Sequence, residues 1–299
     1  MSDSTASSAT ADMPRGSTLA NYIALTKPKQ TALLLATAVG AYVLTASPNL
    51  DWVRGAVGML ALGLAVSGCT VLNMVLDRDI DAMMGRTAAR PLPGGDVDVR
   101  AATLFGMVIS VAGVVIAAFF SLTFWVVVGS GLFFDLIVYT MWLKRRTPLS
   151  ILFGGISGGM PALAGRVLAL GHVDLVGILL AAGVVLWIPS HILTLALRYQ
   201  AEYAEADVPV WPRIYGADAT RRVIAAATLL AAIVLMTAGV LEHIALPALL
   251  LLGILGATIC GLAVYGLVRP SERTNWLLFK GASVYMLGAF VCLTFGAIL

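Results

Sequence analysis

The sequence predicts an all-α integral membrane protein with nine transmembrane helices. The first observation behind this prediction is composition: 60% of the 299 residues are hydrophobic and only 12% are charged, whereas a soluble domain carries about 25% charged residues. The second is a series of apolar runs, most near the length of about 20 residues that crosses a bilayer as helix. The third is an alternation of basic and non-basic loops between these runs.

Nine apolar segments can be separated. They lie at 24–46, 54–76, 101–120, 122–143, 150–170, 175–197, 222–241, 244–267 and 278–298. The stretch 101–143 is too long for one crossing, so we place a tight turn near Ser121 and Thr123. The chain begins with small polar residues and no apolar signal-peptide core. We therefore expect a disordered cytoplasmic tail at 1–20 and a single nine-helix domain at 21–299.

The basic residues indicate the orientation in the membrane. Of the 19 Lys and Arg residues, all but Arg54 and Arg166 fall on the side of every second loop. The positive-inside rule assigns that side to the cytoplasm. We expect a multi-pass protein of the cell membrane, with its N-terminus cytoplasmic, its C-terminus outside, the lipid bilayer around it and no nucleic-acid partner. Function is expected in the two long cytoplasmic loops, 77–100 and 198–221.

An acidic cluster lies where the second segment ends. Asn73, Asp77 and Asp81 are spaced i, i+4, i+8 and share one helix face, while Asp79 points away. Anions at a helix C-terminus oppose the helix dipole, at a cost of about 0.3–1 kcal/mol per charge. A hard cation such as Mg²⁺ would resolve this conflict, because it takes oxygen ligands and leaves positions for phosphate and water.

A solvated helix end is the alternative, with these aspartates paired to Arg78 and Arg86. Spacing alone does not separate the two interpretations. Arg86 and Arg90 precede the Pro- and Gly-rich stretch 91–95. Their guanidinium groups match phosphate oxygens, but they serve equally well as charge compensation.

These motifs are similar to those of a known superfamily. Asn73-x-x-x-Asp77-x-x-x-Asp81, followed by RTAARPLPGG, resembles the first signature of the UbiA-type intramembrane prenyltransferases. YTMWLKRRTPLSILFGGISGGMPALAG at 139–165 resembles the branch of protoheme IX farnesyltransferases, also called haem O synthases. LTKPKQTALLLAT, WIPSHI and EYAEADVPVWP resemble the same branch.

The resemblance implies a fold and a reaction. The fold has nine transmembrane helices around a central cavity that opens toward the cytoplasm. The reaction transfers farnesyl from farnesyl diphosphate to a vinyl group of haem B, with water addition, giving haem O and diphosphate. Mg²⁺ is the implied cofactor and haem B the second substrate, and a haem A synthase or terminal oxidase assembly is a downstream partner.

The resemblance also implies metal ligands. Asn73, Asp77 and Asp81 would hold the ion. Many superfamily members carry a second acidic motif where this chain has Glu202, followed by Ala206. Glu202 is our candidate for a further ligand. An ordinary helix ion pair with Arg198, four residues earlier, is the alternative.

Several basic and aromatic residues receive roles in the same way. Lys144, Arg145 and Arg146 form a basic run that the positive-inside rule alone explains. The resemblance assigns Lys144 and Arg145, together with Arg86, to catalysis. It assigns Arg90, Arg146 and Tyr139 to haem contact.

Three ionisable residues lie inside apolar segments. His191 is either a hydrogen-bonded packing residue or, as the resemblance suggests, a contact or axial ligand of haem. Asp135 and Arg166 lie at different depths, so we expect no pair between them, and Arg166 should snorkel outward. The pattern gives no account of Asp135. The glycines at 154–159 favour close helix packing over room for a macrocycle.

Three other functions remain open. A prenyltransferase acting on a quinone precursor or a lipid would share Asn73, Asp77 and Asp81 but has no need of the block 144–159. A transporter would place its charges near the bilayer midplane, on repeated helices. A catalytically silent haem-binding membrane protein is the third.

Overall fold

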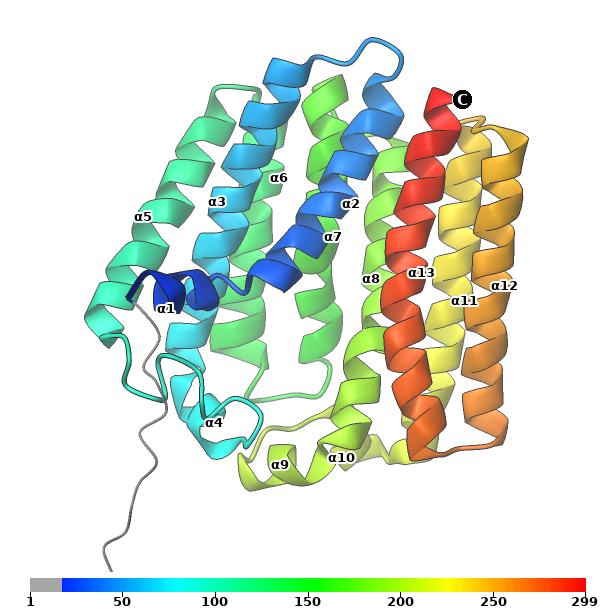
Figure 1. Ribbon diagram of the computed structural model, residues 1–299. Coiled ribbons are helices and arrows are strands. Elements are labelled where there is room, and N and C mark those ends of the chain that lie inside the picture. The colour runs from blue at the N-terminus through cyan, green and yellow to red at the C-terminus, as the bar shows by residue number, and fades with distance from the viewer. Residues whose placement is uncertain (1–17) are drawn as a thin grey trace, which may run out of the picture.

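The computed structural model describes residues 18–299, and within this range it contains helices and no strands. Most of the tail predicted at 1–20 lies outside the described residues, and residues 18–20 belong to α1. Figure 1 shows the long helices running side by side. The elements are α1 (Thr18–Leu25), α2 (Pro28–Ala46), α3 (Trp52–Leu76), α4 (Arg78–Met83), α5 (Val99–Ala118), α6 (Leu122–Leu132), the π-helix η1 (Phe133–Leu143), α7 (Ser150–Leu170), α8 (Leu175–Arg198), α9 (Gln200–Glu205), α10 (Trp211–Tyr215), α11 (Ala217–Leu241), α12 (Leu246–Val268) and α13 (Glu272–Ile298).

The all-helical membrane fold is confirmed, with a correction to the count. Among the described residues, eight helices are long and apolar enough to cross a bilayer, α6 and η1 together forming one of them. The predicted first crossing, 24–46, is the exception because the chain breaks at Lys27 into α1 and α2. Pro28 disfavours helical geometry at the residue before it, and Lys27 adopts a left-handed conformation with φ 45°. Pro28-Lys29-Gln30 then lowers the hydropathy of α2.

The predicted turn near Ser121 is confirmed. α5 ends at Ala118 and α6 begins at Leu122. Ser121 caps α6 by accepting a hydrogen bond from the backbone N–H of Phe124 at 3.1 Å.

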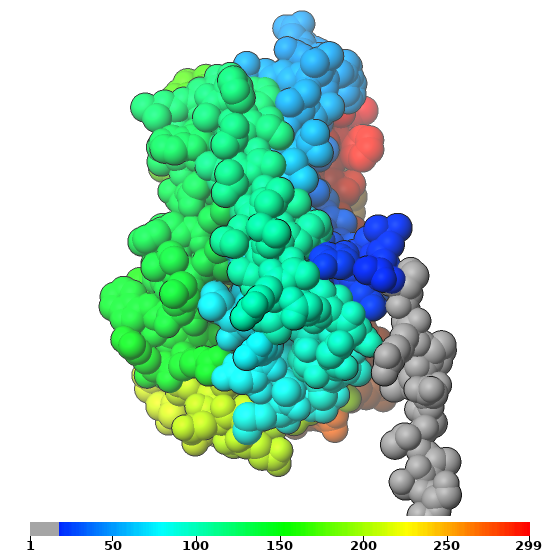
Figure 2. Space-filling model, turned by 90° about the vertical axis from the view of Figure 1, so that its left-hand side faces the viewer, coloured from blue at the N-terminus to red at the C-terminus, as the bar shows by residue number. Residues whose placement is uncertain are grey.

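The helices pack in two groups that share α2 and α7. One core contains α2, α3, α5, α6 and α7, and the other contains α8, α11, α12 and α13 together with α2 and Ala162 of α7. Small residues allow the closest approaches: a Cβ on Gly165 of α7 would lie 2.0 Å from the Ala38 carbonyl oxygen of α2. Figure 2 shows the face that carries α5 and α6. Among the exposed side chains of these two helices are the apolar residues Leu104, Val111 and Trp125, as a lipid-facing surface requires.

The short helices α4, α9 and α10 gather at one end of the bundle, and the C-terminus lies at the other (Figure 1). At the C-terminal end, Arg166 pairs with Asp174 at 2.6 Å and with Glu242 at 2.8 Å. Arg54 donates to the Leu168 carbonyl there, at 2.7 Å. Arg54 and Arg166, the two basic residues outside the alternation of basic loops, therefore lie at the same end of the bundle. Arg166 does not pair with Asp135, as expected.

The π-helix η1 changes which residues share a face. Its backbone hydrogen bonds join residues five apart, as from Lys144 N–H to the Tyr139 carbonyl at 2.8 Å. A turn of this helix is wider than an α-helical turn, so residues 135 and 140 lie on one face. Such segments are rare and are found frequently at functional sites.

Candidate active site

The acidic cluster lies at the joint between α3 and α4. α3 ends at Leu76, and Asp77 caps both helices. Two backbone bonds carry the helical register across the joint: Asp77 N–H donates to the Asn73 carbonyl at 2.9 Å, and Asp81 N–H to the Asp77 carbonyl at 2.8 Å. Asp77 and Asp81 are buried, while Asp79 is exposed. The predicted shared face of Asn73, Asp77 and Asp81 thus survives the break in the helix.

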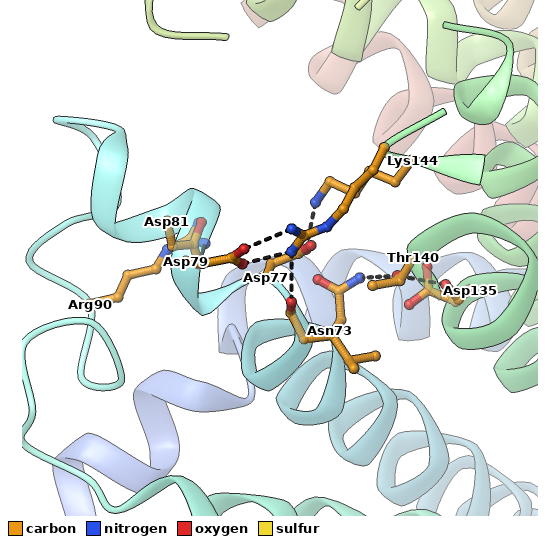
Figure 3. A network of polar contacts seen from close by, with 10 residues as sticks. Asn73, Asp77, Asp79, Asp81, Arg90, Asp135, Thr140 and Lys144 are labelled. Carbon is orange, nitrogen blue, oxygen red and sulfur yellow. Dashed lines mark hydrogen bonds and ion pairs between the residues drawn. The ribbon is translucent and has the colours of Figure 1, made fainter. Parts of the chain in front are cut away.

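Each aspartate has a basic partner (Figure 3). Lys144 Nζ lies 2.5 Å from Asp77 Oδ2, Arg90 lies 2.6 Å from Asp81, and Arg145 lies 2.6 Å from Asp79. The partners are therefore neither Arg78 nor Arg86, which the solvated-end interpretation had required. Arg145 also donates to the Leu76 carbonyl at 3.1 Å, so it links the end of α3 to Asp79 of α4 on the exposed side of the joint.

These pairs hold the charges in place. The hydrogen bond from Arg145 lowers the pKa of Asp79 to about 2. Burial lowers the pKa of Lys144, but Tyr139 and the negative charge of Asp77 outweigh it and hold that pKa above its usual range. Lys144 is therefore a permanently charged ammonium group at neutral pH.

A ladder of three bonded pairs joins α3 to η1 and its end. The rungs are Cys69–Asp135 at 3.2 Å, Asn73–Thr140 at 2.7 Å and Asp77–Lys144 at 2.5 Å. Residues on α3 step by four, which is about 6 Å per rung. On η1 the matching residues are five apart, because its wider turn brings Asp135 and Thr140 onto one side. There, Thr140 Oγ1 donates to the Asp135 carbonyl at 2.7 Å. We call this set the α3–η1 ladder.

The ladder orients the Asn73 carboxamide. Its nitrogen donates to Thr140 Oγ1, and Figure 3 shows its oxygen on the side of Asp77. Asn73 therefore presents an acceptor oxygen beside the Asp77 carboxylate. Oxygen ligands from amide and carboxylate groups suit Mg²⁺.

Two buried carboxylate oxygens support a cation at this site. Within residues 18–299, no group of three His, Cys, Asp or Glu side chains is placed to hold a metal. However, Asp77 Oδ1 and Glu202 Oε2 are buried without a hydrogen-bond partner. An unpartnered buried carboxylate oxygen is costly unless a cation or water satisfies it. The residue types around the joint therefore fit a hard cation, though not as a preformed cage.

Glu202 is not engaged in the predicted ion pair. Arg198 pairs with Glu272 at 3.4 Å and stacks on Trp276, with 4.6 Å to the ring centre. Glu202 Oε2 instead lies 4.0 Å from where a Cβ on Gly85 would be, beside the segment that follows α4. Arg86 lies in the same region, over the Tyr199 ring at 5.7 Å.

Lys27 is a site residue that the sequence analysis missed. It lies at the break between α1 and α2 and is only partly exposed. Burial, followed by the charges of Arg90 and Lys144, lowers its pKa to about 8. Arg90 and Lys144, from distant parts of the chain, are thus close enough for their charges to act on Lys27. The Pro that follows Lys27 inside an apolar segment was the signal that the helix breaks there.

His191 lies between α8 and α13, away from the ladder. Its ring stacks on Trp187 at 4.8 Å and on Phe279 at 4.5 Å between ring centres. Ser283 Oγ lies 3.2 Å from its Nδ1. The packing role considered from sequence is therefore present, and His191 is only partly buried.

Two further predicted haem contacts, Tyr139 and Arg146, lie in different surroundings. Tyr139 lies beneath Lys144, whose Nζ is 5.6 Å from the ring centre. A Cβ on Gly154 would meet the Tyr139 ring at 2.7 Å, and one on Gly159 would meet the Ala181 carbonyl at 2.7 Å. These glycines therefore serve close packing. Arg146 is exposed at the end of η1.

Comparison with known proteins places the chain in a family. Residues 33–291 match the UbiA prenyltransferase family. Protoheme IX farnesyltransferase of Korarchaeum cryptofilum is 43% identical over 214 residues, which is 71% of either chain. The enzyme of the same name from Archaeoglobus fulgidus is 45% identical over 66% of this chain and 69% of its own, and that of Desulforudis audaxviator is 35% identical over 90% and 86%.

Solved structures show the same fold. A structure described for digeranylgeranylglyceryl phosphate synthase superposes with a TM-score of 0.79 at 18% identity, covering 94% of this chain and 98% of that one. A UbiA homologue from Archaeoglobus fulgidus, bound to DMAPP and Mg²⁺, superposes with a TM-score of 0.66 at 14% identity, covering 91% and 99%. The chain belongs to the UbiA prenyltransferase family of multi-pass integral membrane proteins, and the three relatives named above are protoheme IX farnesyltransferases.

Proposed function

We propose that the protein transfers the farnesyl group of farnesyl diphosphate to a vinyl group of haem B, adds water to the product and releases diphosphate, giving haem O. One observation carries this proposal. Asp77 is buried with one oxygen on Lys144 and the other without a partner, at the polar end of an apolar bundle in a prenyltransferase family. That arrangement suits an anionic headgroup on a lipophilic substrate.

The basic residues at the joint bind the diphosphate. Lys144, Arg90 and Lys27 approach from η1, the α4–α5 segment and the start of α2. Their charges stabilise the negative charge that develops on the leaving oxygens. Arg86, exposed over Tyr199, adds a guanidinium group for the outer phosphate.

Asn73, Asp77, Asp81 and Glu202 would hold Mg²⁺. When bound, the ion supplies the positive charge that makes diphosphate a better leaving group. Thr140 fixes the amide of Asn73 for this task. Arg145 would not contact the ion itself; it would position these ligands, because it bonds Asp79 and the last turn of α3.

Haem B is placed by the residues around His191. In the tautomer that donates Nδ1–H to Ser283 Oγ, Nε2 would offer its lone pair to the haem iron, and such a second hydrogen bond is typical of ligating histidines. Arg90 and Arg146 suit the propionates. Tyr139 forms part of the wall between haem and diphosphate. Farnesyl and porphyrin lie in the predicted central cavity, which opens toward the cytoplasm.

The orientation follows from the same charges. The basic residues gather at the end that carries α4, α9 and α10 (Figure 1), which the positive-inside rule places in the cytoplasm of a cell membrane. With the 19-residue helix α2 as the ninth crossing, the N-terminus is then inside and the C-terminus outside. The product passes to a haem A synthase or a terminal oxidase assembly.

A competition assay tests the proposal. Purified protein receives farnesyl diphosphate, Mg²⁺ and equal amounts of haem B and a quinone precursor, with and without a chelator, and the products are identified by mass. We expect a farnesylated, hydrated porphyrin that disappears with the chelator. Prenylated quinone precursor with unchanged haem would contradict the proposal and assign the protein to the alternative prenyltransferase reaction. The absence of any product would favour a transporter or a silent haem-binding protein.

A further inference from the structure

Asp135 is the carboxylate of the α3–η1 ladder that diphosphate binding does not use. It lies in η1, and its carboxylate contacts Cys69 Sγ of α3 at 3.2 Å and Ser157 Oγ of α7 at 3.3 Å. An acid in the apolar part of a membrane protein is costly and usually functional. Asp135 therefore needs an explanation that packing does not supply.

The hydrogen bonds that reach this carboxylate are weak. A thiol is a poor donor. Ser157 has one hydroxyl hydrogen, and the Gly154 carbonyl at 2.7 Å is a nearer acceptor for it. Within residues 18–299, no Lys or Arg lies within ion-pair distance of Asp135. Asp135 also keeps some accessible surface. The carboxylate thus has acceptor capacity left for a water molecule.

Asp135 lies deeper along the ladder than the Asp77–Lys144 rung, on the inner side of the proposed diphosphate site. Cys69, its partner, lies eight residues before Asp77 on α3, about 12 Å along the helix. The carbon that receives water is three bonds from the departing diphosphate oxygen, about 4–5 Å at 1.5 Å per bond. In the proposed binding mode, the diphosphate would extend inward from the Asp77–Lys144 rung, which would bring the reacting carbon toward Asp135. A water held by Asp135 is thus on the inner side of the reacting carbon, away from the leaving group.

The geometry points to Asp135 as the group that binds the attacking water and accepts its proton in the final step of the reaction. This inference rests on the proposed function. The vinyl π-electron pair forms the bond to farnesyl C1 while the C1–O pair leaves with diphosphate. The cation left beside the porphyrin accepts a lone pair from water, forming the C–O bond. One O–H bond of that water breaks, and its proton passes to the Asp135 carboxylate, which leaves the hydroxyl group on the product.

A base at this place decides between two products. If water is not held and deprotonated, the cation loses a proton from the neighbouring carbon instead. The product is then an alkene that is lighter than haem O by one water. The ratio of hydroxylated to dehydrated porphyrin therefore reports on Asp135 directly, and it does not depend on how much folded enzyme is present.

The test compares wild type with Asp135→Asn, Asp135→Glu and Asp51→Asn, using haem B, farnesyl diphosphate and Mg²⁺ in ¹⁸O-labelled water. Asparagine keeps the shape of Asp135 but accepts no proton. Asp51→Asn makes the same chemical change at the far end of α3, where asparagine preserves the helix cap. Porphyrin products are separated and weighed, and thermal melting is followed for each variant.

We expect ¹⁸O-labelled hydroxylated product from wild type and Asp51→Asn. In Asp135→Asn the hydroxylated-to-dehydrated ratio should fall at least tenfold, and Asp135→Glu should recover part of it. An unchanged ratio in Asp135→Asn overturns the inference, as does complete loss of farnesylation with wild-type melting, because the residue would then act before the C–C bond forms. If Asp135→Asn does not fold, Asp135→Ala takes its place, and an unchanged ratio in that variant overturns the inference. Absence of farnesylated porphyrin with wild type refutes the proposed function instead.

Discussion

The Asn73 amide nitrogen donates to Thr140 Oγ1 at 2.7 Å, across 67 residues of sequence. This bond is the middle rung of the α3–η1 ladder, and it turns the amide oxygen toward Asp77 (Figure 3). A ligand that is oriented before the ion arrives binds it more tightly, because less freedom is lost on binding.

Replacing Thr140 with valine tests this orienting role. Valine keeps the shape but cannot accept the hydrogen bond, whose net worth is about 1 kcal/mol. We expect the Mg²⁺ concentration for half-maximal activity to rise about fivefold to tenfold in Thr140→Val and to stay near wild type in Thr140→Ser. Equal Mg²⁺ dependence in all three proteins would remove Thr140 from the site.

Variants of the Asp77–Lys144 pair distinguish its contribution to stability from its contribution to catalysis. Lys144→Met leaves the Asp77 charge buried and unpaired, which costs about 3–5 kcal/mol in such sites and should lower the melting temperature in detergent. The double variant Asp77→Asn/Lys144→Met removes both charges and should recover most of that loss. Both variants should remain inactive, because the diphosphate contacts are gone. Recovery of activity in the double variant would show that the pair is only structural.

Lys27 predicts a pH dependence of substrate binding. Burial and its basic neighbours hold its pKa near 8 in the free protein, so the charge that attracts diphosphate disappears as the pH rises through that value. KM for farnesyl diphosphate should therefore increase between pH 7 and pH 9. Lys27→Arg stays charged and should give a flat profile, whereas a profile like wild type in this variant would assign the titration to another group.

The same lowered pKa has a stability consequence of defined sign. The unfolded chain, with an ordinary lysine pKa of 10.5, binds more protons than the folded one between pH 8 and 10.5. Without substrate, the protein should therefore gain stability across that window. Melting curves of wild type and Lys27→Met should converge as the pH rises, and a constant gap between them would contradict the assignment.

At the opposite end of the bundle, Arg166 joins Asp174 and Glu242. Arg166→Met leaves two largely buried acids without their cation, so the melting temperature should fall clearly while the rate per folded molecule is retained. Burial raises the pKa of Asp174, but Arg166 and the Gly177 N–H outweigh it and hold it below 3.8. The stabilisation should therefore be complete above about pH 4 and be lost at lower pH. Loss of activity at full stability would place Arg166 in the mechanism.

Asp79 provides the matched comparison for Asp77. It is exposed and bonded to Arg145, and surface pairs are worth about 0–1 kcal/mol. Asp79→Asn should keep activity within about threefold of wild type. A loss as large as that of Asp77→Asn would mean that the exposed side of the joint also binds substrate.

Much of this arrangement was predictable from sequence, because hydropathy and charge alternation act locally. Ser121 marked the split of the 101–143 run, and the four-residue spacing placed Asn73, Asp77 and Asp81 together. That spacing holds although α3 ends at Leu76, since two backbone bonds continue the register through Asp77.

The partners of those residues were not predictable. Periodicity arguments assume an α-helical turn, and the π-helix η1 breaks that assumption by stacking Asp135 and Thr140 five apart. Lys27 was counted only as a topological charge, because its place in the site depends on a break inside an apolar run. The pairing of Asp77 with Lys144 depends on helix packing, which no local pattern encodes.

The most direct test of the account is the rate of farnesylated haem formation by Asp77→Ala compared with wild type, at equal amounts of folded protein and saturating Mg²⁺. We predict a decrease of at least about a hundredfold, because the variant would lose a ligand of the ion that stabilises the developing charge. Haem farnesylation by Asp77→Ala within a few fold of wild type would contradict the account.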